Sequence, residues 1–199
     1  MACVFGAVVA VAACSSKDDA KGVGGTEADA HVLDSSADSA LKSDTSDALS
    51  PACAGACLQT ALEINIGGKK RALDRAQLGT QRNDAGRAQL HVEAHSGGMP
   101  ECPTQTSATP TYTLIVNGVP RGAPGGQASK SDGVTSAFFD FKGDLGLPPL
   151  TKATSVSITS LVEDPATPPA WSAFDITAVF PEGAVTGHIY APYCLSLSD

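Results

Sequence analysis

The sequence has few aromatic residues, no excess of positive charge and no long apolar run, and each absence excludes a class of protein. Aromatic residues are 5% of the 199 residues, so a core must be built mainly from small and β-branched side chains. The chain has 13 Lys and Arg and 21 Asp and Glu, which gives a formal net charge of −8. Nucleic-acid affinity depends on Lys and Arg placed against phosphates, so we expect no nucleic-acid partner.

The apolar run near the start, residues 4–13, has only ten residues. A membrane-spanning helix needs about 20, whereas the apolar region of a secretory signal peptide needs about 7–15. The run therefore predicts a signal peptide and not a transmembrane segment. No Lys or Arg precedes Val4, although signal peptides begin with positive charge, so we expect the true start to lie upstream of Met1.

The run ends in Val11-Ala12-Ala13-Cys14, which resembles the lipobox of bacterial lipoproteins. The resemblance implies that a signal peptide of residues 1–13 is removed and that Cys14 is acylated and becomes the N-terminus. It also implies the bacterial cell envelope as the location, with a lipid anchor in the membrane, and Ser15 after the cysteine suggests the outer membrane. The alternative, an ordinary cysteine in a buried N-terminal helix, fits poorly with so short a run followed by charged residues.

Residues 14–50 have the composition of a disordered tether. Between residues 15 and 50 there are no aromatic residues, and eight acidic residues against three lysines give −5 of the total charge. Such a segment cannot bury enough apolar surface to offset the entropy of ordering. We expect it to hold the folded domain away from the bilayer. Calcium binding by Asp34 and Asp38 is the alternative, but the glycine and distal Glu of an EF-hand loop are absent.

Residues 51–199 read as one antiparallel β-sandwich, immunoglobulin-like or jelly-roll-like. Short apolar or alternating stretches are separated by Gly, Pro, Asn and Asp, which is typical of all-β domains. Residues 81–86 and 181–183 are predicted hairpin turns. The longer connections 96–110 and 118–132 are where we expect any binding site. The predicted strands are 58–66, 71–80, 87–95, 111–117, 134–142, 155–162, 173–180 and 184–190.

The domain contains four cysteines, an even number that predicts two disulfides in an exported protein. Three pairings of Cys53, Cys57, Cys102 and Cys194 are possible. We favour a bridge from the 53–57 segment to Cys194, because it would tie the two ends of the domain together. A zinc site from the same cysteines is less favoured, since Cys102 and Cys194 do not form a second close pair.

The sharpest local motif is His91-x-Glu93-x-His95. With a strand period of two, these three side chains share one face, where they could ligate a divalent metal with His188 as a further ligand. The competing interpretation is a solvated outer face, which a half-buried antiparallel strand needs in any case. Asp140, which lies between aromatic residues, is predicted to point outward from its strand.

Other motifs carry little chemistry. There is no Gly-x-Ser-x-Gly sequence, so a hydrolase nucleophile is not indicated. The basic residues 69–71, with Arg75, could meet an acidic partner or lipid headgroups, but they are more typical of a solvated turn and edge strand.

We therefore predict a non-enzymatic, envelope-anchored domain that binds or scaffolds an unknown envelope or extracellular partner and needs no cofactor. The alternative is a metal-binding protein or metal-dependent enzyme with one divalent metal on His91, Glu93 and His95.

Overall fold

The computed structural model describes residues 53–199. The predicted signal peptide, the predicted acylation site Cys14 and the predicted tether of residues 14–50 lie outside the described residues. In the described part of the chain, no helix has the length and apolar character needed to cross a membrane.

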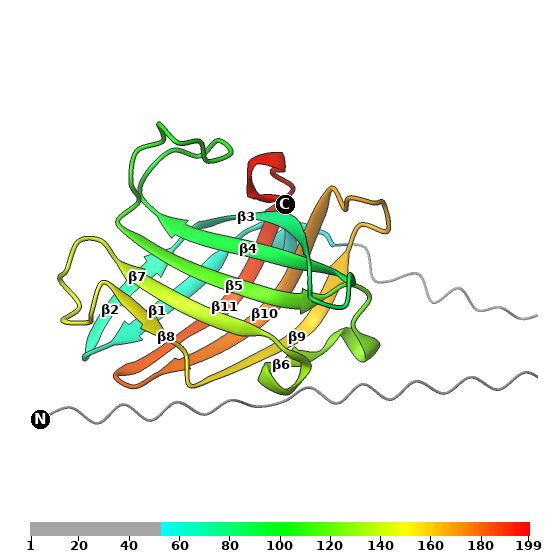
Figure 1. Ribbon diagram of the computed structural model, residues 1–199. Coiled ribbons are helices and arrows are strands. Elements are labelled where there is room, and N and C mark those ends of the chain that lie inside the picture. Colours follow the sequence, from blue (N-terminus) through cyan, green and yellow to red (C-terminus); the bar gives the residue numbers. More distant parts are fainter. Residues whose placement is uncertain (1–52) are drawn as a thin grey trace, which may run out of the picture. The chain divides into compact units, whose positions relative to one another are not determined.

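The described chain forms two antiparallel sheets that face each other (Figure 1). One has six strands in the order β2-β1-β11-β10-β9-β6, and the other has five in the order β3-β4-β5-β7-β8. Every strand pair is antiparallel, so the predicted β-sandwich is confirmed. The strands are β1 (Ala61–Ile66), β2 (Lys69–Leu73), β3 (Arg75–Arg82), β4 (Ala88–Ser96), β5 (Tyr112–Pro120), β6 (Ala128–Ser129), β7 (Thr135–Asp140), β8 (Leu150–Lys152), β9 (Ser155–Glu163), β10 (Trp171–Phe180) and β11 (Gly183–Pro192). Short 3₁₀ turns occupy η1 (Gly55–Leu58), η2 (Pro124–Gly126), η3 (Lys130–Asp132) and η4 (Leu195–Leu197).

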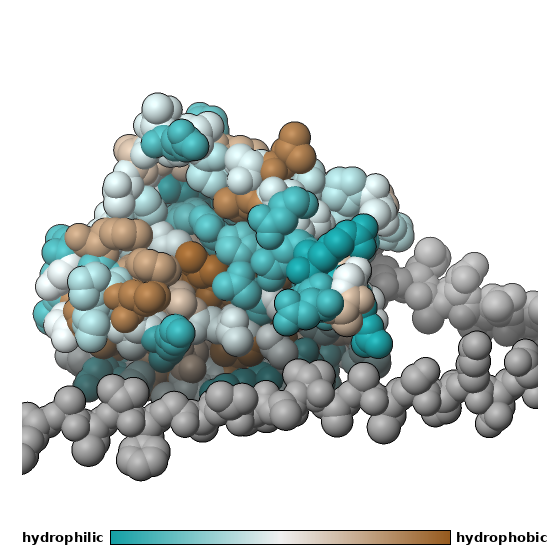
Figure 2. Space-filling view, viewed as in Figure 1, coloured by the Kyte–Doolittle hydropathy of each residue, from teal (hydrophilic) through white to brown (hydrophobic). Residues whose placement is uncertain are grey.

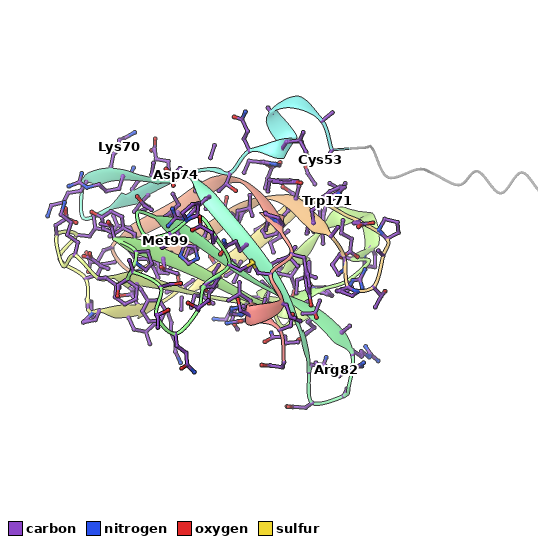
Figure 3. The ribbon with its side chains drawn as sticks, turned by 90° about the horizontal axis from the view of Figure 1, so that it is seen from above. Cys53, Lys70, Asp74, Arg82, Met99 and Trp171 are labelled. Atoms are coloured by element: carbon purple, nitrogen blue, oxygen red, sulfur yellow. A yellow bond between two sulfur atoms is a disulfide. The ribbon has the colours of Figure 1, made fainter. Side chains whose placement is uncertain are left out.

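The core fills the space between the sheets, as Figure 3 shows from above. β1 shows the alternation expected of a strand with one buried face: its six residues alternate between exposed and buried. An aromatic stack crosses the core, with the Phe138 ring centroid 6.2 Å from that of Tyr112 and 5.9 Å from that of Phe180 on the other sheet. Three of the ten aromatic residues of the chain thus pack across the space between the two sheets.

The predicted strand 71–80 is two strands, because the chain changes sheet at Asp74. β2 belongs to the six-stranded sheet and β3 to the five-stranded sheet. Both Leu73 and Ala76 are buried in the common core, so the apolar pattern continues across the change of sheet. The short strands β6 and β8 were not predicted. Both predicted hairpin turns are confirmed: 81–86 joins β3 to β4, and 181–183 joins β10 to β11.

The cysteines form two disulfides, but the pairing that we favoured is wrong. Cys53 is bonded to Cys57, and Cys102 is bonded to Cys194. The 53–57 segment already lies beside β11, because the Cys57 carbonyl oxygen is 3.0 Å from Nε2 of His188. The long-range bond instead joins the 97–110 connection to the C-terminal segment. All four sulfurs are used, which leaves no thiolates for the alternative zinc site.

The outward orientation predicted for Asp140 is wrong. Its side chain is 3% exposed and shares the inner face of β7 with Phe138, so Phe139 and Phe141 take the outer positions. The buried carboxylate accepts hydrogen bonds from the backbone N–H groups of Gly143 at 2.7 Å and Leu145 at 2.8 Å. These bonds fix the loop that carries Asp144.

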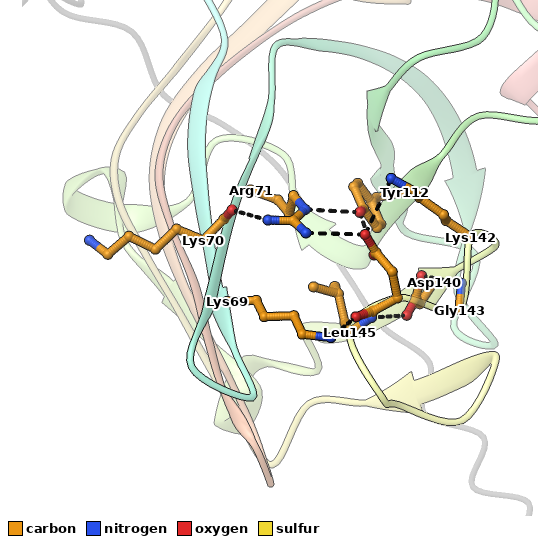
Figure 4. A network of polar contacts seen from close by, with 9 residues as sticks. Lys69, Lys70, Arg71, Tyr112, Asp140, Lys142, Gly143 and Leu145 are labelled. Carbon is orange, nitrogen blue, oxygen red and sulfur yellow. Dashed lines mark hydrogen bonds and ion pairs between the residues drawn. The ribbon is translucent and has the colours of Figure 1, made fainter.

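Asp144 belongs to a network of polar contacts that joins the two sheets, and Figure 4 labels Arg71, Tyr112 and Lys142 of this network. Tyr112 on β5 donates its hydroxyl to this carboxylate at 2.5 Å, and Arg71 on β2 donates from Nη2 at 3.1 Å. Lys142 adds an ion pair at 3.3 Å. The Lys69 ammonium donates to the Asp144 carbonyl. β2 is the predicted basic edge strand, and the guanidinium of Arg71 is used within the domain.

The Asp144 contacts predict acid sensitivity. The hydrogen bond from Tyr112, helped by Arg71 and Lys142, lowers the pKa of Asp144 from 3.8 to about 2. A depressed pKa contributes stability above the unfolded-state value and loses it as the pH falls through the folded-state value. The stability difference between wild type and Asp144→Asn should therefore shrink between about pH 4 and pH 2. Urea unfolding across this range tests it, with the exposed Asp84→Asn as control; a constant difference would contradict the assignment.

Candidate functional site

The outer face of the five-stranded sheet carries a charged half and an apolar half. Pairing registers align its outward residues in rows that run across the strands. The β3 and β4 ends of these rows are charged or polar, and the β5, β7 and β8 ends are mainly apolar. One row is Arg75, His95, Thr113, Phe139 and Leu150, and the next is Gln77, Glu93, Ile115, Ala137 and Lys152.

The predicted His91-x-Glu93-x-His95 row lies on this outer face, but it is not a solvated face. His95 is only 7% exposed. The Glu93 carboxylate sits between the two rings: Oε1 is 3.0 Å from Nε2 of His91, and Oε2 is 3.6 Å from Nε2 of His95. Nδ1 of His91 contacts Oδ1 of Asn117, and Nδ1 of His95 is 3.1 Å from Oγ1 of Thr113.

The two histidines have opposite electrostatic environments. Both nitrogens of His91 face oxygen acceptors, so the protonated ring satisfies both contacts. The hydrogen bond with Glu93 raises the pKa of His91 above 6.5. Burial lowers the pKa of His95 below 6.5, and the nearby positive charge of Arg75 adds to the effect. Glu93 thus favours the protonated form of His91, whereas burial favours the neutral form of His95.

The geometry does not gather these residues around a common point. Each Glu93 oxygen faces a different imidazole, and among residues 53–199 no cluster of three His, Cys, Asp or Glu side chains is arranged to hold a metal ion. His188 is on β11 of the other sheet, where its Nδ1 is 2.8 Å from Asp175. It therefore cannot join His91 and His95 in one ligand set.

A loop covers the charged half of this face. Residues 97–110, which we call the covering loop, connect β4 to β5 and are bonded through Cys102 to Cys194. Gln77 on the sheet reaches up to the covering loop, and its Nε2 donates to the carbonyl oxygens of Pro100 at 2.9 Å and Glu101 at 2.8 Å. The covering loop is thus held over the sheet by one covalent bond and by a buried side chain.

The C-terminal segment supports the same arrangement. After β11 it leaves the six-stranded sheet and runs beside β3, where the N–H of Cys194 donates to the Leu78 carbonyl at 2.7 Å. A Cβ at Gly79 would lie 2.0 Å from the Leu197 carbonyl oxygen. Only glycine at this position lets the segment lie this close to the sheet, and this packing places Cys194 within reach of Cys102.

Between the covering loop and the sheet lies a cleft of about 350 Å³, which we call the outer-face cleft. Its floor includes Gln77, Glu93, His95, Thr113 and Ile115. Its walls include Met99, Glu101, Pro103 and Ser107 of the covering loop. The volume lies within the range of small-molecule sites, about 300–1,000 Å³. The prediction that any site would lie at the longer connections agrees with this position, since the covering loop belongs to the 96–110 connection.

Two groups in the outer-face cleft were not predicted from the sequence. Arg75 was grouped with residues 69–71, but the change of sheet at Asp74 places it in the cleft. Phe139 and Phe141 lie at the other end, with ring centroids 5.5 Å apart and planes 12° apart. In Figure 2 the brown, apolar surface gathers over β7 and β8, beside a teal region over the polar strands. The spacing of Phe139 and Phe141 at i and i+2 could have placed both rings on one face of the strand. This was missed because Asp140 was predicted to take the outward position.

Three residues of the outer-face cleft follow one another in the order of a nucleophile, a base and an acid, but they lack the geometry of a catalytic triad. Thr113 is hydrogen-bonded to His95, which faces Glu93. However, the Glu93 contact of 3.6 Å is too long for a hydrogen bond. The residues lie in mid-strand, where backbone N–H groups are used in the sheet ladders, so strand amides do not supply an oxyanion hole. The arrangement is therefore suited to binding.

Comparisons with family models, with curated proteins and with solved structures found no match for this chain.

The Glu93 contacts predict how the histidines titrate. In Glu93→Gln, the pKa of His91 should fall toward 6.5, because the charged acceptor is lost. A group whose pKa is raised on folding stabilises the folded state fully below its unfolded-state pKa, and this stabilisation is lost as the pH rises through its folded-state pKa. The loss of stability that His91 causes with rising pH should therefore be smaller in Glu93→Gln. Imidazole C–H chemical shifts measured against pH test both rings. Glu101→Gln, in the same cleft, is the control, and equal His91 titration in all three proteins would contradict the assignment.

Proposed function

We propose that this chain is an envelope-anchored lipoprotein whose β-sandwich is a non-enzymatic binding domain, with the outer-face cleft as its ligand site. The observation that carries the binding proposal is the pinned covering loop. Solvent or closely packed side chains are enough to cover a sheet face that binds nothing. Here a disulfide and Gln77 hold the covering loop above the sheet and leave a cleft of about 350 Å³. A preformed concave site of this kind lowers the entropic cost of binding.

The lipobox and the disulfides support the envelope location. Cys14 follows the apolar run 4–13, and two disulfides are typical of proteins that fold outside the reducing cytosol. The acidic, aromatic-free segment 15–50 would give the domain reach from the membrane to meet its ligand or partner.

The anchor is tested by fatty-acid labelling and membrane fractionation of the full chain in a Gram-negative host. Label and membrane association should be present in the wild type and lost in Cys14→Ser, because acylation requires the cysteine thiol. Cys3→Ser should keep both, since Cys3 lies in the removed signal peptide. An unlabelled wild type would contradict the proposal.

The binding site is tested with a neutral fluorescent probe, N-phenyl-1-naphthylamine, and the full chain carrying Cys14→Ser. Ala108 lines the outer-face cleft, so Ala108→Trp should obstruct it and weaken probe binding by at least about tenfold. Ala85→Trp, at the exposed tip of the β3–β4 hairpin, should bind like the parent. Equal binding by both variants would show that the probe does not use the cleft and would contradict the proposed site.

A further inference from the structure

The charged end of the outer-face cleft holds an arginine that no described residue neutralises. Arg75 lines the cleft and makes no ion pair within residues 53–199. Its one hydrogen bond is a long one, 3.4 Å from Nη1 to the Gly98 carbonyl oxygen. Its Nε is closed off from solvent without an acceptor. A guanidinium offers five N–H donors, and leaving a buried donor unpaired costs about 1–3 kcal/mol.

The acidic groups nearby do not take up this charge. Glu93 faces the rings of His91 and His95, and its Oε1 contact with His91 is 3.0 Å. Glu101 is exposed on the covering loop, and its backbone carbonyl oxygen, not its carboxylate, is tied to Gln77. Arg75 is the only Lys or Arg of residues 53–199 that lines the outer-face cleft, and its guanidinium is therefore the cation that is free for an external partner.

The other end of the cleft exposes apolar side chains. Phe141, which lines the cleft, is 51% exposed, and Leu150, the register partner of Phe139, is 46% exposed. These are two of the six large apolar side chains exposed in the described residues. Together with the Phe139 ring, they form an apolar surface at this end of the cleft, of the kind that ligand sites expose.

Charge and apolar surface lie along one row of the sheet. Arg75 on β3 and Phe139 on β7 are joined through His95 and Thr113 by three strand spacings. At about 4.8 Å for each spacing, their backbones lie about 14 Å apart. A span of this size fits a fused-ring compound or a short acyl chain with one polar end.

We propose that the outer-face cleft binds an amphiphilic anion, whose carboxylate, sulfonate or phosphate lies against Arg75 and whose apolar body lies on Phe139 and Phe141. This inference rests on the proposed function and names its ligand class. Arginine suits this role because its planar guanidinium pairs with such oxyanions through two parallel hydrogen bonds.

The test compares two probes that differ by one sulfonate, 1-anilinonaphthalene-8-sulfonate and N-phenyl-1-naphthylamine. Both are titrated into the full chain carrying Cys14→Ser, with and without Arg75→Gln. Arg75→Gln should weaken the sulfonate probe by about tenfold or more, the size of one charge-assisted hydrogen bond, and leave the neutral probe unchanged. Arg87→Gln, in the exposed β3–β4 hairpin, is the matched control and should affect neither. Near-ultraviolet circular dichroism and a binding ratio of one probe per chain show that the variants are folded.

The outcomes separate the inference from the proposed function. If Arg75→Gln leaves sulfonate binding unchanged while Ala108→Trp still weakens the neutral probe, the cleft binds ligands but the anion assignment is overturned. If Ala108→Trp affects neither probe, both proposals are overturned. Displacement of the sulfonate probe by octanoate or by octyl phosphate distinguishes a carboxylate ligand from a phosphate ligand, and either result supports the inference. Displacement by neither would contradict it.

Discussion

The covalent bond between Cys102 and Cys194 is the constraint on which the described site depends. It closes a loop between residues 92 positions apart and fastens the covering loop to a segment that lies against β3. That segment can lie there because Gly79 has no side chain. Gln77 then adds two hydrogen bonds from the sheet to the covering loop. Without this attachment, a polar loop of Gly, Pro, Ser and Thr would have little reason to stay over the sheet and enclose a cleft.

The same constraint explains why the histidine row is largely shielded from solvent. Covering the charged half of the face removes solvent from His95 and lowers its pKa, while Glu93 pairs with His91. The row therefore supplies a polar floor whose side chains contact one another. Arg75 lies at the end of that floor without an ion-pair partner among the described residues, and Phe139 and Phe141 lie at the opposite end. The cleft thus combines an unpaired guanidinium with an apolar surface, which is the chemistry of the proposed amphiphilic ligand.

Much of the fold followed from local patterns, and the parts that did not follow were set by tertiary contacts. Alternation and turn residues placed most of the strands and both hairpins. The change of sheet at Asp74 was hidden, because Leu73 and Ala76 enter the same core from different sheets. The disulfide pairing was open, because three pairings satisfied the same sequence. Asp140 was assigned to the wrong face, since an inward carboxylate is stable only with the backbone donors of Gly143 and Leu145.

The candidate site was found in part. Strand period identified the shared face of His91, Glu93 and His95, but it could not show that a loop 97–110 would cover that face. Arg75 was missed because its neighbours in sequence, residues 69–71, belong to another sheet. Sequence thus located the polar residues of the site, whereas the enclosure and the apolar end required the fold.

Hydrogen exchange with and without the neutral probe tests most directly the claim that the cleft under the covering loop is the binding site. The account predicts that N-phenyl-1-naphthylamine slows exchange in residues 97–110 and leaves β10 and β11 of the other sheet unchanged. Slower exchange confined to β10 and β11, or no change in the covering loop at saturating probe, would contradict it.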